Sequence, residues 1–133
     1  MKRIREKDYK NDNSYDEFKK EDIMEGGELS GAFFVSAITT MFNLTKEMHA
    51  TVDHVVKDLA ESGWTEIQEP RKGAIVVWEK QKFGNEEHKQ IGFYVGDDEA
   101  ISNSSAEKVP TKHDLTFGGK RKVTDYFWNE KLD

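Results

Sequence analysis

The stretch that decides the fold is Leu29-Ser30-Gly31-Ala32-Phe33-Phe34-Val35-Ser36-Ala37-Ile38-Thr39-Thr40-Met41-Phe42. It carries no charged residue, although 35% of the residues in the chain are charged. Apolar residues recur on every face of a helix drawn through this stretch, which is typical of a buried helix rather than a surface helix. The stretch is shorter than the roughly 20 residues that a membrane span requires. We therefore expect a central core helix over residues 29–42.

Residues 51–62 predict a second helix, which is amphipathic. The apolar residues have the spacing i, i+3, i+4 and i+7, and they are Val52, Val55, Val56 and Leu59. Thr51 is suited to cap the helix N-terminus, and Gly63 to follow its C-terminus. The opposite face, with Asp53, Lys57, Asp58 and Glu61, is expected to be a solvated surface.

After Trp64 the pattern changes to strands. We expect them over residues 73–79, 90–95, 100–102, 108–112 and 123–128, with a hairpin turn at Gly96-Asp97-Asp98. Helices followed by a run of strands predict an α+β domain, in which the two helices pack on an antiparallel sheet of about five strands. Residues 29–133 would form this single domain. Residues 1–28 would form a polar N-terminal arm, or a first helix around residues 15–24.

Composition excludes several classes of function. The chain has 133 residues and a formal net charge of −6, which disfavours a nucleic-acid binder, because phosphate binding requires clustered Lys and Arg. There is no cysteine, and hence no disulfide, zinc–thiolate site or cysteine nucleophile. We expect no cofactor, no metal and no membrane association. The N-terminal residues contain no apolar segment of the kind found in secretory signals, so a cytoplasmic location is expected.

Three local patterns occur together in order along the chain. The first is Ser30-Gly31-Ala32-Phe33-Phe34-Val35-Ser36 at the start of the core helix, and the second is Pro70-Arg71-Lys72-Gly73-Ala74-Ile75-Val76-Val77-Trp78, which runs into the first expected strand. The third is Gln90-Ile91-Gly92-Phe93-Tyr94-Val95-Gly96, which is followed by Ala100-Ile101-Ser102-Asn103. In this combination the chain resembles the NlpC-type branch of the papain-like cysteine peptidases and amidases, over roughly residues 29–128. Members of that family mostly cut peptides of the bacterial cell wall.

The resemblance implies a reaction that this chain lacks the groups to perform. The family's nucleophilic Cys falls on Gly31, and its His base falls on Gln90. The third, orienting position falls on Asn103 or His113. A thiolate at a helix N-terminus and a neighbouring imidazole are the reacting groups of such a site. Glutamine accepts no proton near neutral pH, so the inherited reaction is expected to be absent.

The sequence also offers a replacement pair beside these positions. Ser30 lies beside the family's Cys position, and His88 would point to the same face of its strand as Gln90. These two residues would make a new hydrolytic pair, but Ser30 is better explained as the N-cap of the core helix.

The leading functional hypothesis is a pseudoenzyme that keeps a groove for a peptide or a loop of another protein. The residues expected to line the groove are Ser30, Gly31, His88, Gln90, Asn103 and His113. One alternative is a cysteine peptidase or amidase whose nucleophile and base were altered in this chain. Another is a small acidic binding, inhibitory or immunity module, whose negative charge would suit a basic partner.

Other polar and aromatic residues have simpler interpretations. His49 and His54 would be surface or capping residues, and Glu86-Glu87-His88 a solvated loop rather than a metal site. His113-Asp114 is open to two interpretations, a carboxylate-oriented imidazole or a turn. The strand aromatics are expected to pack in the core. They are Trp78, Phe93, Tyr94, Phe127 and Trp128.

Overall fold

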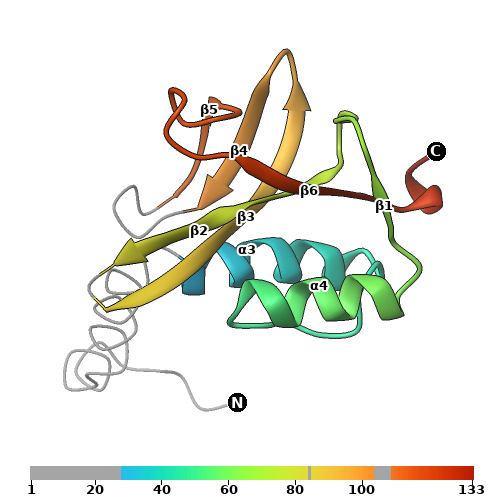
Figure 1. The fold of residues 1–133 in the computed structure, drawn as a ribbon. Helices are drawn as coiled ribbons and strands as arrows, with labels where there is room; N and C mark the ends of the chain where they lie inside the picture. The colour runs from blue at the N-terminus through green and yellow to red at the C-terminus, as the bar shows by residue number, and fades with distance from the viewer. Residues whose placement is uncertain (1–27, 84, 104–108) are drawn as a thin grey trace, which may run out of the picture.

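A computed structural model describes residues 28–83, 85–103 and 109–133. It has two α-helices, α3 (Glu28–Met41) and α4 (Val52–Glu61), and an open six-stranded sheet. The expected N-terminal arm or first helix lies outside the described residues. Both helices lie against the same side of the sheet (Figure 1). Neither of these described helices is long and apolar enough to cross a membrane.

The sheet is antiparallel throughout, with the strand order β1-β6-β2-β3-β4-β5. The strands are β1 (Thr65–Ile67), β2 (Ile75–Phe83), β3 (Glu86–Gly96), β4 (Glu99–Asn103), β5 (Pro110–Asp114) and β6 (Val123–Trp128). The α+β class is therefore confirmed. The expected count of about five strands was too low, because β1 was missed. It has only three residues and two of them are exposed, so it carries no apolar run that a pattern would detect.

Four strands also have bounds that differ from the expected ones. β2 covers Ile75–Phe83 instead of residues 73–79, and β4 covers Glu99–Asn103 instead of residues 100–102. β3 begins at Glu86, so residues 86–88 belong to a strand and the expected loop was wrong. The strand is longer because Glu86, Glu87 and His88 pair with the outer half of β2 beyond the core, where polar side chains alternate without an apolar signal. The fifth strand lies over Pro110–Asp114 rather than residues 108–112, since Asp114 pairs with Glu99.

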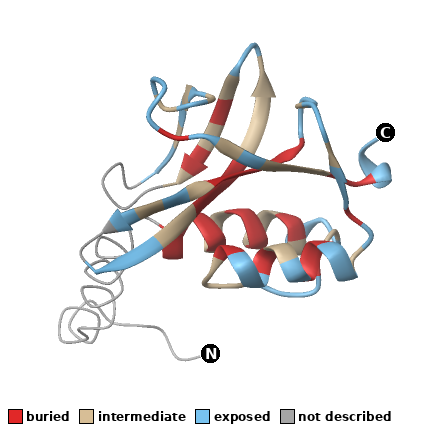
Figure 2. Cartoon of the chain, viewed as in Figure 1, coloured by how far each residue is buried: buried red, intermediate tan, exposed pale blue. Residues whose placement is uncertain are grey.

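The middle of the sheet is buried on both faces, which explains the unbroken apolar run in β2. Residues 74–78 are at most 1% exposed (Figure 2). Ile75 and Val77 contribute to the core cluster beneath the helices, whereas Val76 and Trp78 form a second cluster with Ala100. The expectation that the strand aromatics pack in the core is confirmed, because Trp78 and Trp128 are buried and the other three pack against these clusters.

Local sequence explains the ends of several elements. The Thr51 hydroxyl accepts a hydrogen bond from the His54 amide and caps α4, as predicted. The hairpin turn expected at Gly96-Asp97-Asp98 is confirmed: Gly96 ends β3, and Asp97 and Asp98 form a two-residue turn in which both have positive φ. Gly92 is required where these strands meet, because a Cβ there would collide with the Ile101 carbonyl.

Candidate functional site

The first turn of α3 is buried and anchored by Glu28. One carboxylate oxygen of Glu28 lies 2.7 Å from Nδ1 of His88, and the other accepts a hydrogen bond of 2.9 Å from the Val52 amide. Glu28 therefore ties the start of α3 to β3 and to the N-terminus of α4. The prediction that Ser30 caps α3 was wrong, because the helix already begins at Glu28 and Ser30 lies inside its first turn, where it is buried.

Gly31 in this first turn lies directly against Gln90 of β3. A Cβ built on Gly31 would overlap Oε1 of Gln90 and would lie 3.6 Å from the backbone carbonyl of Asn103 on β4. The Gln90 carboxamide thus fills the space that any side chain at position 31 would need. We call Gly31, Gln90 and Asn103 the Gly31 site.

The Gln90 side chain is held at both of its polar atoms. Nε2 donates to the Asn103 carbonyl at 3.2 Å, and Oε1 accepts from the Ile91 amide at 3.1 Å. Gln90 is only 3% exposed. A side chain that is both buried and hydrogen-bonded in this way is a fixed part of the helix–sheet junction.

The two candidates for the third position lie in different places. Asn103 adjoins Gln90 through its backbone carbonyl, and its side-chain Oδ1 is buried with no hydrogen-bond partner among the residues that the structure describes. His113 instead contacts the Ser102 hydroxyl through Nε2 at 2.8 Å, and its ring stacks on Phe117 beside the Trp78 cluster. The structure therefore brings Gly31, Gln90 and Asn103 together and places His113 elsewhere.

Asp114 does not orient His113 through its carboxylate. Nδ1 of His113 donates to the backbone carbonyl of Asp114 at 2.7 Å, while the carboxylate of Asp114 accepts from the Gly118 amide. This bond to Gly118 is the largest cause of a lowered pKa for the Asp114 carboxyl. Both residues belong to β5, and Asp114 shapes the turn that follows the strand.

His88 lies between two carboxylates. Its Nδ1 faces Glu28 and its Nε2 lies 3.0 Å from Glu86. Carboxylates at both ring nitrogens suit a protonated imidazole, because only that form donates from both nitrogens. A histidine held in this way leaves neither nitrogen to take a proton from Ser30. The geometry therefore does not favour the Ser30–His88 pair as a nucleophile and base.

Arg121 contacts the backbone of His88, and no motif in the sequence had indicated this role. Its guanidinium is buried and donates to the backbone carbonyls of Glu79 and His88. Burial lowers the pKa of Arg121, and the Glu79 and Glu28 carboxylates offset part of this effect. The short basic run of residues 120–122 was the only signal, and it does not distinguish the buried arginine from the exposed lysines on either side.

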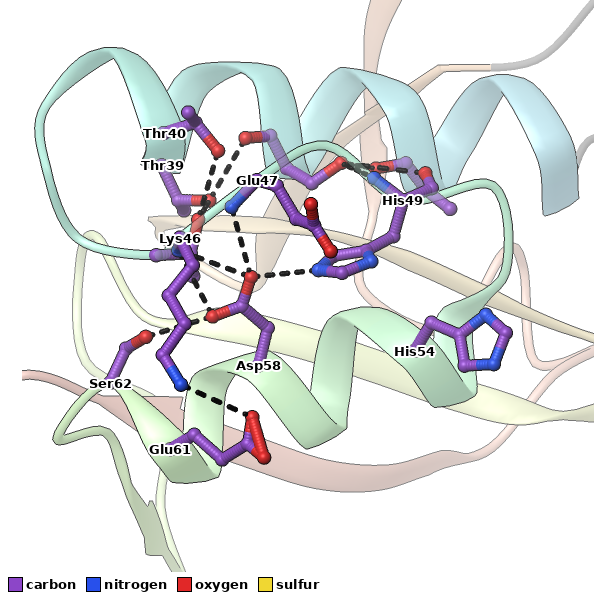
Figure 3. A network of polar contacts seen from close by, with 12 residues as sticks. Thr39, Thr40, Lys46, Glu47, His49, His54, Asp58, Glu61 and Ser62 are labelled. Atoms are coloured by element: carbon purple, nitrogen blue, oxygen red, sulfur yellow. Dashed lines mark hydrogen bonds and ion pairs between the residues drawn. The ribbon is translucent and has the colours of Figure 1, made fainter.

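A second polar cluster, which we call the Asp58 network, contains Lys46, Glu47, His49, Asp58 and Ser62 (Figure 3). Asp58 accepts from the backbone amides of Lys46 and Glu47, from the Ser62 hydroxyl, and lies 2.7 Å from Nε2 of His49. The prediction that Asp58 lies on a solvated face was wrong, because the loop between the helices folds over it and leaves it 3% exposed. His49 is accordingly a partner of Asp58, not a surface residue.

The charge of Asp58 is stabilised by these contacts. Burial alone would raise the pKa of its carboxyl. The hydrogen bonds from His49, from the two backbone amides and from Ser62 outweigh burial and lower the pKa to about 2. His54 points away from Asp58 in Figure 3. Across the described residues, no group of three His, Asp or Glu side chains is arranged to hold a metal ion.

The structure places Gly31, at the start of the buried helix α3, against Gln90 and the backbone carbonyl of Asn103. The start of a buried helix would stabilise a thiolate at position 31, and a base at position 90 would lie beside it. Glycine and glutamine supply neither a nucleophile nor a proton acceptor. Comparisons of the chain with protein-family models, with curated proteins and with solved structures find no match.

Proposed function

We propose that this chain is a papain-like domain of the NlpC type that has lost its reaction and keeps a binding role, with a peptide or a loop of another protein as its ligand. The observation that carries the proposal is the contact between Gly31 and Gln90. These two positions, far apart in the sequence, are the ones to which the resemblance assigns the nucleophile and the base.

The two replacements fit one another physically. With Gln90 in its place, a cysteine at position 31 would collide with the carboxamide, and with glycine there the carboxamide is accommodated. The absence of a side chain at position 31 and the occupation of that space by the Gln90 carboxamide therefore depend on one another. A neutral, hydrogen-bonded carboxamide in this space supports the loss of the reaction better than it supports an active hydrolase.

A ligand would bind at the rim of this site. Ser30, Gly31 and Gln90 are buried, whereas Asn103 is half-buried and the side chain of His88 is 13% exposed. The unpartnered Oδ1 of Asn103 is an acceptor that a peptide amide could satisfy if the site opens slightly. Backbone amides are the donors that every peptide ligand provides.

The test is a titration of the isotope-labelled protein with a short cell-wall peptide, followed by NMR and by mass spectrometry of the peptide. We expect saturable shifts of the Gly31, Gln90 and Asn103 amides, and an intact peptide. Cleavage above the rate without protein would contradict the loss of chemistry. The absence of shifts at millimolar peptide would contradict the binding role.

A matched control variant is Asn103→Leu, which has a similar volume and no acceptor. Peptide affinity should fall while the fold, read from the remaining amide signals, is retained. Equal affinity in the variant and the parent would exclude Asn103 from the ligand contact.

A further inference from the structure

An apolar pocket lies at the C-terminal end of α3, and it shares no lining residue with the Gly31 site. Its volume is about 420 Å³, within the roughly 300–1,000 Å³ typical of small-molecule sites. Six apolar side chains from α3, the loop after it, the sheet and the C-terminal 3₁₀ helix Glu130–Leu132 form its walls. They are Ile38, Phe42, Leu44, Trp64, Phe93 and Leu132.

Two of the six apolar side chains in this wall are exposed to solvent. Phe42 is 66% exposed and Leu132 is 40% exposed, in a chain of which 35% of the residues are charged. Large apolar side chains gathered at the mouth of a pocket leave surface in water that a bound apolar group would cover. The deeper wall, in contrast, is rigid, because Trp64 is 5% exposed and donates to the Leu44 carbonyl at 2.7 Å.

The charge at this pocket has one sign. Lys131 is the charged residue among those that line it. Arg71 and Asp133, which lie nearby, pair with one another, and Arg71 also lies over the Trp128 ring. None of the ion pairs found between described residues uses the Lys131 amine. A carboxylate entering the pocket would therefore meet a cation without displacing another anion there.

We propose that this pocket binds a small amphipathic carboxylate, with its aliphatic chain against Phe42, Trp64 and Phe93 and its carboxylate on Lys131. The apolar walls would supply most of the affinity through burial of the chain. Lys131 would add a smaller, charge-dependent part, because an exposed ion pair contributes up to about 1 kcal/mol. This site does not depend on the function proposed for the Gly31 site.

The test uses the full chain and dodecanoate, below the concentration at which it forms micelles, with 1-dodecanol as the uncharged probe. Binding is followed by calorimetry and by the fluorescence of Trp64, with Trp64→Phe identifying its signal. We expect one saturable site. Lys131→Gln should weaken dodecanoate roughly fivefold and leave dodecanol unchanged.

Two neighbouring variants separate the pocket from general adsorption. Phe42→Asp places a charge on the wall, and it should abolish binding of both probes. Met41→Asp changes a residue that is 74% exposed and does not line the pocket, so it should leave binding unchanged. Non-saturable binding, or equal losses in the two variants, would overturn the proposal. Both substitutions lie on the surface, and melting curves will show whether they fold as the parent does.

Discussion

The Asp58 network and the Gly31 site each contain a buried polar side chain, Asp58 and Gln90, yet they differ in how completely their polar groups are hydrogen-bonded. Four groups donate to or contact the Asp58 carboxylate (two backbone amides, a hydroxyl and an imidazole), and the pKa of this carboxyl is lowered to about 2. The Gly31 site has a filled space instead of a side chain, and the Oδ1 of Asn103 has no partner. A saturated network is the sign of an architectural role. The Gly31 site, at the start of α3, has one buried acceptor without a partner among the described residues, and we propose that a reaction was lost there.

The largest expected effect is at Asp58. Asp58→Asn removes the charge that four donors stabilise, and places an amide group against backbone N–H groups. We expect the free energy of unfolding to fall by about 3 kcal/mol in urea titrations. Glu61→Gln is the control, because the Lys46–Glu61 pair is exposed and should contribute less than about 0.5 kcal/mol. Similar losses in the two variants would show that the buried carboxylate of Asp58 contributes no more to stability than the exposed carboxylate of Glu61.

The same network predicts a dependence on pH. Because the Asp58 pKa is lower in the folded chain than in the unfolded chain, its contribution is complete above about pH 4 and is lost as the pH falls toward 2. The difference in unfolding free energy between the parent and Asp58→Asn should be about 1 kcal/mol smaller at pH 3 than at pH 7. A constant difference would show that the network acts without its charge.

Glu28 should have the next largest effect, because it joins the two helices to β3. Glu28→Ala removes the acceptor for the Val52 amide and the contact with His88, and we expect a loss of about 2 kcal/mol. Glu86→Ala is a matched control, since Glu86 faces the other nitrogen of the same imidazole but its side chain is 70% exposed. Its loss should be below about 0.5 kcal/mol. Equal losses would mean that burial of the carboxylate is unimportant.

At the Gly31 site, we expect the effect of Gly31→Ala on the free energy of unfolding to change sign when Gln90 is also replaced. Gly31→Ala should destabilise the parent by about 1–2 kcal/mol, because the new Cβ overlaps Gln90. In the Gln90→Ala background the same change should stabilise by up to about 1 kcal/mol, as alanine normally does in a helix. A double-mutant cycle in urea measures this coupling. Additive effects would contradict the packing of the two positions as a pair.

The smallest effect is expected at Asn103. Because its Oδ1 has no partner, Asn103→Ala should change the unfolding free energy by less than about 0.5 kcal/mol. Ser62→Ala, which removes a 2.8 Å hydrogen bond to Asp58, should cost about 1 kcal/mol. A larger loss of unfolding free energy for Asn103→Ala than for Ser62→Ala would contradict the view that the Asp58 network stabilises the fold more than the Asn103 side chain does.

The sequence predicted elements with strong local signals. The uncharged stretch of α3, the spacing of Val52, Val55 and Leu59, and the cap at Thr51 each report the conformation of their own segment. β1 was missed because three residues that pair with β6 carry no periodicity of their own. Strand β3 was placed too short because its first residues are polar on both faces.

The polar sites depend on contacts between distant segments, and local patterns do not contain them. Asp58 is buried by a loop that returns from α3, and Ser30 is no cap because Glu28 already anchors the first turn. The choice between Asn103 and His113 required the strand register, which places His113 opposite Ala100 and beside Trp78. The contact between Gly31 and Gln90 was expected only through the resemblance, not from spacing.

The most direct measurement of the central claim is restoration of the reactive pair, Gly31→Cys with Gln90→His, compared with each single variant. The rate of alkylation by iodoacetamide would be followed against pH. The account predicts that the double variant alone keeps reacting well below the ordinary cysteine pKa of about 8.5, because the helix N-terminus and the imidazole stabilise the thiolate. A folded double variant with the pH profile of the single Gly31→Cys variant would contradict it.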